Sequence, residues 1–78
     1  MRITYEEFRG LVKENLAKQL TELDDAQLEE YLDSEDSVDA IKQEYDLSVK
    51  QLERGEITEK EFRNGSVSAA AHCLYMLY

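Results

Sequence analysis

The chain has 78 residues, with 9 Lys and Arg against 18 Asp and Glu, which gives a formal net charge of −9. A chain of this length forms one domain, residues 1–78, and buries only about 60% of the surface that its unfolded form exposes, so a deep enzyme pocket is not expected. The single cysteine excludes an internal disulfide framework. Together with the lack of a signal peptide, it leads us to expect a cytoplasmic location.

A helix is predicted from about residue 5 to residue 20. Its first turn has a Thr at the N-cap, a Glu three residues later and an apolar residue on each side, which together form a capping box and a hydrophobic staple. The same arrangement recurs near the end of the chain. The two copies are Ile3-Thr4-Tyr5-Glu6-Glu7-Phe8-Arg9 and Ile57-Thr58-Glu59-Lys60-Glu61-Phe62-Arg63. Each copy fixes where a helix begins and carries no chemistry of its own.

A short helix is predicted from residue 25 to residue 32, with Asp24 as the N-cap and Gln27 three residues on. This region is also the acidic centre of the chain, because residues 22–39 hold nine acidic residues and no basic one. They are Glu22, Asp24, Asp25, Glu29, Glu30, Asp33, Glu35, Asp36 and Asp39. This acidic segment is the candidate partner-binding face.

The third helix is predicted from about residue 38 to residue 54. Its apolar residues recur at intervals of three and four, which places them on one face of a helix. They are Val38, Ile41, Tyr45, Val49 and Leu52. Gly55 then supplies the left-handed position that commonly ends a helix.

The last helix is predicted from residue 59 to residue 77, and Asn64-Gly65 either kinks it or divides it. From Val67 onward it is apolar on nearly every side, as a buried helix is. Three other helices can barely surround it, so this helix is either the centre of the bundle or partly in contact with another chain. The candidate apolar interface consists of Leu74, Tyr75, Leu77 and Tyr78.

The predicted fold is therefore all-α, a small bundle of four helices at about 5–20, 25–32, 38–54 and 59–77. We expect no catalytic residues, no metal site and no cofactor. His72 and Cys73 are adjacent, so on a helix they point about 100° apart, and neither has a second histidine or cysteine to work with. We expect Cys73 to pack as a small hydrophobe and His72 to lie at the edge of the core.

One stretch reads Leu47-Ser48-Val49-Lys50-Gln51-Leu52-Glu53-Arg54-Gly55-Glu56-Ile57-Thr58-Glu59-Lys60-Glu61-Phe62. It resembles the short helical hairpin at the C-terminus of many bacterial proteins, in which a leucine-bearing helix is followed by Gly-x-Ile-Thr-x-x-Glu-Phe and a second helix. The opening Tyr5-Glu6-Glu7-Phe8, followed by Val12-Lys13-Glu14, is similar to small proteins of Gram-positive bacteria and their mobile elements. The first resemblance implies a hairpin over residues 47–62, and neither brings functional residues.

Two functions of different classes fit the sequence. The first is a non-enzymatic interaction protein that binds a basic, nucleic-acid-binding protein through residues 22–39. Phage and mobile-element inhibitors that imitate DNA, including anti-CRISPR proteins, are often acidic proteins of this size. The second is a structural or assembly protein that forms a homodimer, or docks on a complex, through its apolar C-terminal helix.

Two further classes of partner are not expected. Direct nucleic-acid binding is disfavoured because the nine Lys and Arg are dispersed along the chain. A membrane partner is disfavoured because the longest apolar-rich stretch, residues 67–78, is too short to span a bilayer.

Overall fold

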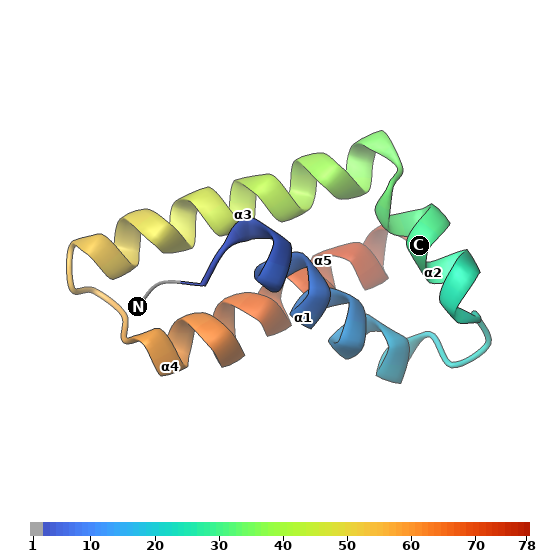
Figure 1. Ribbon diagram of the computed structural model, residues 1–78, viewed down its shortest axis with the longest axis horizontal. Helices are drawn as coiled ribbons and strands as arrows, with labels where there is room; N and C mark the ends of the chain where they lie inside the picture. The colour runs from blue at the N-terminus through green and yellow to red at the C-terminus, as the bar shows by residue number, and fades with distance from the viewer. Residues whose placement is uncertain (1–2) are drawn as a thin grey trace.

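The computed structural model describes residues 3–78, and this part of the chain folds as a small all-α bundle without strands (Figure 1). The elements are α1 (Tyr5–Gln19), α2 (Asp25–Leu32), α3 (Glu35–Glu53), α4 (Glu59–Glu61), the π-helical turn η1 (Phe62–Ser66) and α5 (Val67–Leu77). Because α4, η1 and α5 follow one another without a break, they form one long last helix. The predicted class, with a short second helix and four helices in all, is confirmed.

The last helix forms the centre of the packing. α1 packs mainly on α5, and α3 packs on both α5 and η1. The molecule is elongated, with extents of 38 × 22 × 20 Å, and α2 lies at one end of it beside the C-terminal end of α5 (Figure 1). The buried core consists of Ile3, Phe8, Val12, Leu16, Leu20, Leu28, Leu32, Ile41, Phe62, Val67, Ala70, Ala71 and Leu74.

Two of the three predicted capping boxes are complete. The Asp24 carboxylate accepts from the Gln27 backbone amide at 2.8 Å, and the Gln27 side chain accepts from the Asp24 amide at 2.9 Å. Thr58 and Glu61 make the same pair of bonds at 3.1 and 2.9 Å. These bonds satisfy amides that a helix start leaves without partners.

The first copy of the repeated motif forms only half of its box. The Thr4 hydroxyl accepts from the Glu7 amide at 3.2 Å, but the Glu7 carboxylate accepts from that hydroxyl at 3.4 Å rather than from the Thr4 amide. The aromatic residues of the two copies meet in the core, where the rings of Phe8 and Phe62 lie edge to face with centroids 5.7 Å apart. The repeated motif therefore also provides an aromatic contact between the first and last helices.

α3 begins three residues earlier than predicted, at Glu35, because Ser34 takes the extended backbone of an N-cap. Acidic side chains in its first turn, Glu35 and Asp36, suit the positive end of the helix dipole. Only Asp33 and Ser34 separate α2 from α3, so the two helices form a tight corner.

The buried face of α3 is also rotated from the predicted one. Ser37 and Ser48 are fully buried with Ile41, whereas Val38 is only half-buried. Both hydroxyls have local partners, since Ser34 Oγ lies 2.9 Å from Ser37 Oγ and Ser48 Oγ lies 3.4 Å from a Glu44 carboxylate oxygen. Because their polar atoms are satisfied, these small side chains can occupy core positions at which the sequence pattern predicts larger apolar ones.

Residues 64 and 65 do not divide the last helix, but they interrupt its regular α-helical turns. The backbone passes through them as a π-helical turn, which fits one extra residue into the helix. Phe62, Ser66 and Val67 all face the core, while Asn64 and Gly65 remain exposed. The extra residue thus places both Ser66 and Val67 on the buried side.

Gly55 ends α3 as predicted, with a φ of +76°. The Glu56 amide donates to the Gln51 carbonyl at 2.9 Å and the Gly55 amide donates to the Leu52 carbonyl at 3.1 Å. This pair of bonds is the Schellman motif, which requires a left-handed residue at this position.

Substitution of Gly55 by Ala should therefore lower the free energy of unfolding by about 1 kcal/mol, because a Cβ is disfavoured at positive φ. Gly10 provides the matched control, since it is exposed inside α1 and an added Cβ meets no atom within 4 Å. Gly10→Ala should raise the free energy of unfolding by about 0.5–1 kcal/mol. Urea denaturation of both variants measures the two effects, and a stabilised Gly55→Ala protein would contradict the assignment.

Candidate interaction site

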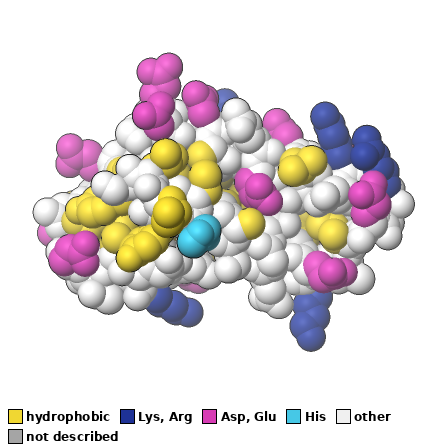
Figure 2. All heavy atoms as spheres, turned by 180° about the vertical axis from the view of Figure 1, so that it is seen from behind, with side chains coloured by type: hydrophobic (Ala, Val, Ile, Leu, Met, Phe, Trp, Pro, Cys, Tyr) yellow, Lys and Arg dark blue, Asp and Glu magenta, His cyan; other side chains and the backbone are white. Residues whose placement is uncertain are grey.

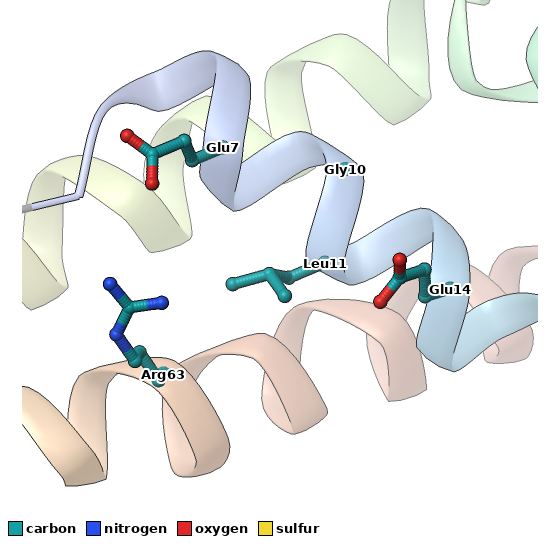
Figure 3. Close-up of a pocket in the computed structure, with 5 residues that line it drawn as sticks. All are labelled: Glu7, Gly10, Leu11, Glu14 and Arg63. Carbon is teal, nitrogen blue, oxygen red and sulfur yellow. The ribbon is translucent and has the colours of Figure 1, made fainter.

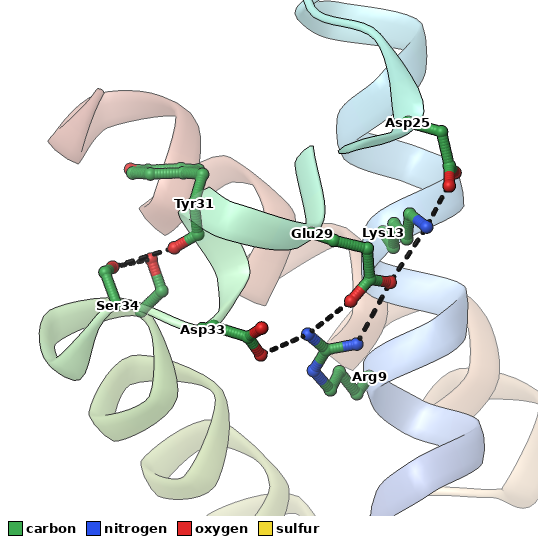
Figure 4. Close-up of polar contacts among 8 residues, drawn as sticks. Arg9, Lys13, Asp25, Glu29, Tyr31, Asp33 and Ser34 are labelled. Carbon is green, nitrogen blue, oxygen red and sulfur yellow. Dashed lines mark hydrogen bonds and ion pairs between the residues drawn. The ribbon is translucent and has the colours of Figure 1, made fainter. Parts of the chain in front are cut away.

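Part of the acidic segment is turned towards α1, where it forms a ladder of ion pairs (Figure 4). Lys13 Nζ lies 2.7 Å from Asp25 and 2.8 Å from Glu29, and Arg9 lies 3.0 Å from Glu29 and 2.9 Å from Asp33. The two cations are four residues apart on α1 and the three carboxylates are four apart along α2. Residues four apart share a helix face, so two such faces meet along one line.

Glu29 is the centre of this ladder. Hydrogen bonds from Arg9, and then from Lys13, lower the pKa of its carboxyl to about 2. The cationic side chains are about one-fifth exposed, whereas Glu29 is 41%, Asp33 72% and Asp25 84% exposed, so water screens much of the attraction. The ladder therefore orients α2 on α1 and adds only modestly to stability.

The acidic segment thus divides into two groups with different roles. Asp25, Glu29 and Asp33 pair with α1, and Asp24 caps α2. The other five are exposed and make no ion pair within residues 3–78. They are Glu22, Glu30, Glu35, Asp36 and Asp39, and we call them the free carboxylates.

The candidate apolar interface is only partly exposed. Leu74 is fully buried, so its inclusion in that interface was wrong: it lies on the α5 face that packs into the core. Tyr75 is 44% exposed, Leu77 58% and Tyr78 59%, and Met76, which the sequence analysis did not select, is 69% exposed. We call Tyr75, Met76, Leu77 and Tyr78 the apolar end.

Tyr31 joins the apolar end to the acidic segment. Its hydroxyl donates to the Leu74 carbonyl at 2.6 Å, and its ring packs edge to face on Tyr78 with centroids 5.4 Å apart. Its own carbonyl accepts from the Ser34 hydroxyl at 2.7 Å, so the corner between α2 and α3 is tied to the same residue (Figure 4). Burial raises the pKa of the Tyr31 phenol, and the nearby Asp36 carboxylate adds to this increase.

The two surfaces that the sequence analysis treated as alternatives are therefore neighbours. Figure 2 shows hydrophobic side chains gathered at one end of the molecule, close to the histidine, with acidic side chains and a basic side chain around the patch. The position of Tyr31 beside Leu28 and Leu32, three residues and one residue away on α2, is a weak sequence signal for this arrangement, and it does not indicate which element covers Tyr31.

A hollow of about 240 Å³ lies on another part of the surface, between α1 and η1 (Figure 3). It is lined by Glu7, Gly10, Leu11, Glu14 and Arg63. Its charged side chains are exposed, so water screens them and no desolvated acid or base is available there.

His72 and Cys73 also lie at the surface. Both are exposed, so the expected packing of Cys73 as a core hydrophobe and of His72 at the core edge is wrong. The covered face of α5 is formed by Val67, Ala70, Ala71 and Leu74. Over residues 3–78, no group of three His, Cys, Asp or Glu side chains is arranged to hold a metal ion. Within the same range no helix has the length and apolar character needed to cross a membrane.

Comparison of the chain with protein-family models, with curated proteins and with solved structures finds no match.

The ladder predicts a defined pH dependence of stability. Because the pKa of Glu29 is lowered in the folded state, the unfolded state binds more protons, and stability is present above about pH 4.5 and is lost as the pH falls towards 2. The difference in unfolding free energy between the native protein and Glu29→Gln should shrink across that range. Glu30→Gln is the control, because Glu30 is a free carboxylate on the same helix. An equal pH profile for the two variants would contradict the role of the ladder.

The Tyr31 hydroxyl gives a second prediction. Tyr31→Phe removes the donor to the Leu74 carbonyl and should lower the free energy of unfolding by about 1 kcal/mol. It should also speed hydrogen exchange in the last turn of α5. Tyr75→Phe, in which the lost hydroxyl belongs to an exposed ring, should change neither quantity. If the two variants behave alike in both measurements, the bond does not fix the end of α5.

Proposed function

We propose that the protein is a small, non-enzymatic interaction protein that binds a basic partner protein. The observation that supports this most directly is the group of five free carboxylates. They lie on α2, on the loop before it and on the first turns of α3, all at one end of the molecule, in a segment that holds no basic residue. Fixed negative charge of this kind speeds association with a positively charged surface and selects against negatively charged ones.

The arrangement of the carboxylates bears on the narrower idea of DNA imitation. A DNA strand presents charges at an even spacing of about 3.4 Å. The most regular row in this chain, Asp25, Glu29 and Asp33, is directed at Arg9 and Lys13, and the tight corner before α3 interrupts the remainder. We therefore propose that the partner is a protein with a basic surface. Inhibition of a nucleic-acid-binding protein would be one example of such binding.

A second candidate function is self-assembly through the last helix. The observation that favours it is the apolar end, four large side chains between 44% and 69% exposed at the end of α5. Exposed apolar patches on small proteins commonly mark interaction sites. In this case the protein would be a homodimer or an assembly component, and the acidic segment would serve only to keep it in solution.

Affinity capture from a bacterial lysate tests the main proposal. The native protein should retain a basic protein that Glu30→Gln/Asp36→Asn/Asp39→Asn loses. The control is Glu14→Gln/Asp46→Asn/Glu56→Gln, which removes the same amount of charge elsewhere on the surface and should retain it. If all three proteins retain the same partners, the acidic segment does not contribute to partner binding and the proposal is wrong.

A further inference from the structure

Tyr31 belongs to the acidic segment and contacts the end of α5 through Leu74 and Tyr78. The exposed surface there has an apolar centre, Tyr75, Met76, Leu77 and Tyr78. Acidic side chains lie near this patch (Figure 2), and Asp36 of α3 is close enough to Tyr31 to affect its phenol. An apolar centre inside a charged rim is the usual anatomy of a protein interface. Tyrosine and methionine, which make up three of these four residues, are also enriched in interfaces.

We propose that this end of the protein binds a basic amphipathic helix of its partner, with the apolar face of that helix on the apolar end and its Lys and Arg beside the free carboxylates. This inference rests on the proposed function and adds the partner's secondary structure and the side chains that give affinity. The negative rim and the neutral centre together require a ligand that is apolar in the middle and positive at its edges.

A helix is the form of ligand that fits, because the described residues offer no strand. Binding by strand addition needs a free sheet edge, and residues 3–78 contain no sheet. The exposed side chains of α5 are instead presented by a helix end, the kind of surface on which another helix packs through its apolar stripe. Basic amphipathic helices combine such a stripe with flanking positive charge.

The same rim argues against the apolar end as a homodimer interface. A two-fold interface uses the same patch on both copies, so the free carboxylates of one copy would approach those of the other. Each copy also carries a formal net charge of −9. Like charges across an interface oppose association, whereas a basic helix turns the same rim into an attraction.

The experiment measures binding of fluorescently labelled model peptides to the full chain by anisotropy. The first probe is a peptide of about 18 residues, about five helical turns, built from Leu and Lys with Leu at helical spacing. The second probe has the same composition in an order that places Leu on no single face. The native protein should bind the first peptide about tenfold or more tightly than the second, since only the first can bury its Leu side chains together.

Two variants separate the apolar and the charged contributions. Met76→Ser/Leu77→Ser should weaken binding of the first peptide by about tenfold or more, while Leu47→Ser, which removes an exposed apolar side chain of α3, should leave it unchanged. Glu30→Gln/Asp36→Asn/Asp39→Asn should weaken binding at low salt, and this loss should largely disappear near about 0.5 M salt. The altered side chains are exposed, so circular dichroism should show the native helix content. The single variant Leu77→Gln tests the same apolar contribution to peptide binding with a smaller change to the protein.

The possible failures can be told apart. If Met76→Ser/Leu77→Ser binds as well as the native protein while the carboxylate variant binds less, the inference fails and the proposed function stands. If Glu30→Gln/Asp36→Asn/Asp39→Asn and the native protein bind the first peptide equally well at low salt, both the inference and the proposed function fail. A native protein that sediments as a dimer, and as a monomer after Met76→Ser/Leu77→Ser, would overturn the inference in favour of self-assembly.

Discussion

The structure depends on the burial of a helix that carries no charged side chain. α5, from Val67 to Leu77, has no Asp, Glu, Lys or Arg. The hydrophobic effect therefore favours covering it with the rest of the chain. Only α1 and α3 are long enough to do so, and they cover one face, on which Ala70, Ala71 and Leu74 lie. The small size of the chain therefore leaves the last turn of α5 exposed, and this is where its large aromatic and apolar side chains lie.

The exposed end of α5 is next to α2 because of two long-range contacts. α2 has eight residues, too few for a stable isolated helix, so tertiary contacts must hold it. Arg9 and Lys13 hold one face of it through the ion-pair ladder, and Tyr31 holds another through the Leu74 carbonyl. Charge in this segment consequently has two environments, since some carboxylates pair with α1 and others are exposed without an ion pair among residues 3–78. A count of acidic residues along the sequence cannot separate these environments.

How much could be predicted from the sequence depends on the range of each interaction. Helix starts such as Thr58 were predictable because a capping box is complete within four residues. The buried positions of Ser37 and Ser48 were not, because a serine belongs in a core only where two helices are close and its hydroxyl finds a local hydrogen-bond partner. The ladder had a sequence signal, matching four-residue spacings of opposite charge on two neighbouring helices. The bond from Tyr31 to Leu74, across 43 residues, had none.

That last bond changes how the two sequence-based hypotheses relate to each other. A free acidic surface by itself gives fast but weak and salt-sensitive association, because exposed charge pairs are screened. An apolar end by itself gives affinity without selectivity, and it would favour self-association. Tyr31 places the two side by side. In the function that we propose, the carboxylates would select positive partners and repel copies of the chain, and the apolar side chains would add buried area that holds a selected partner. We therefore propose one composite surface in place of the choice between an acidic binder and an apolar assembly surface, and the chemistry of the proposed partner follows from both parts.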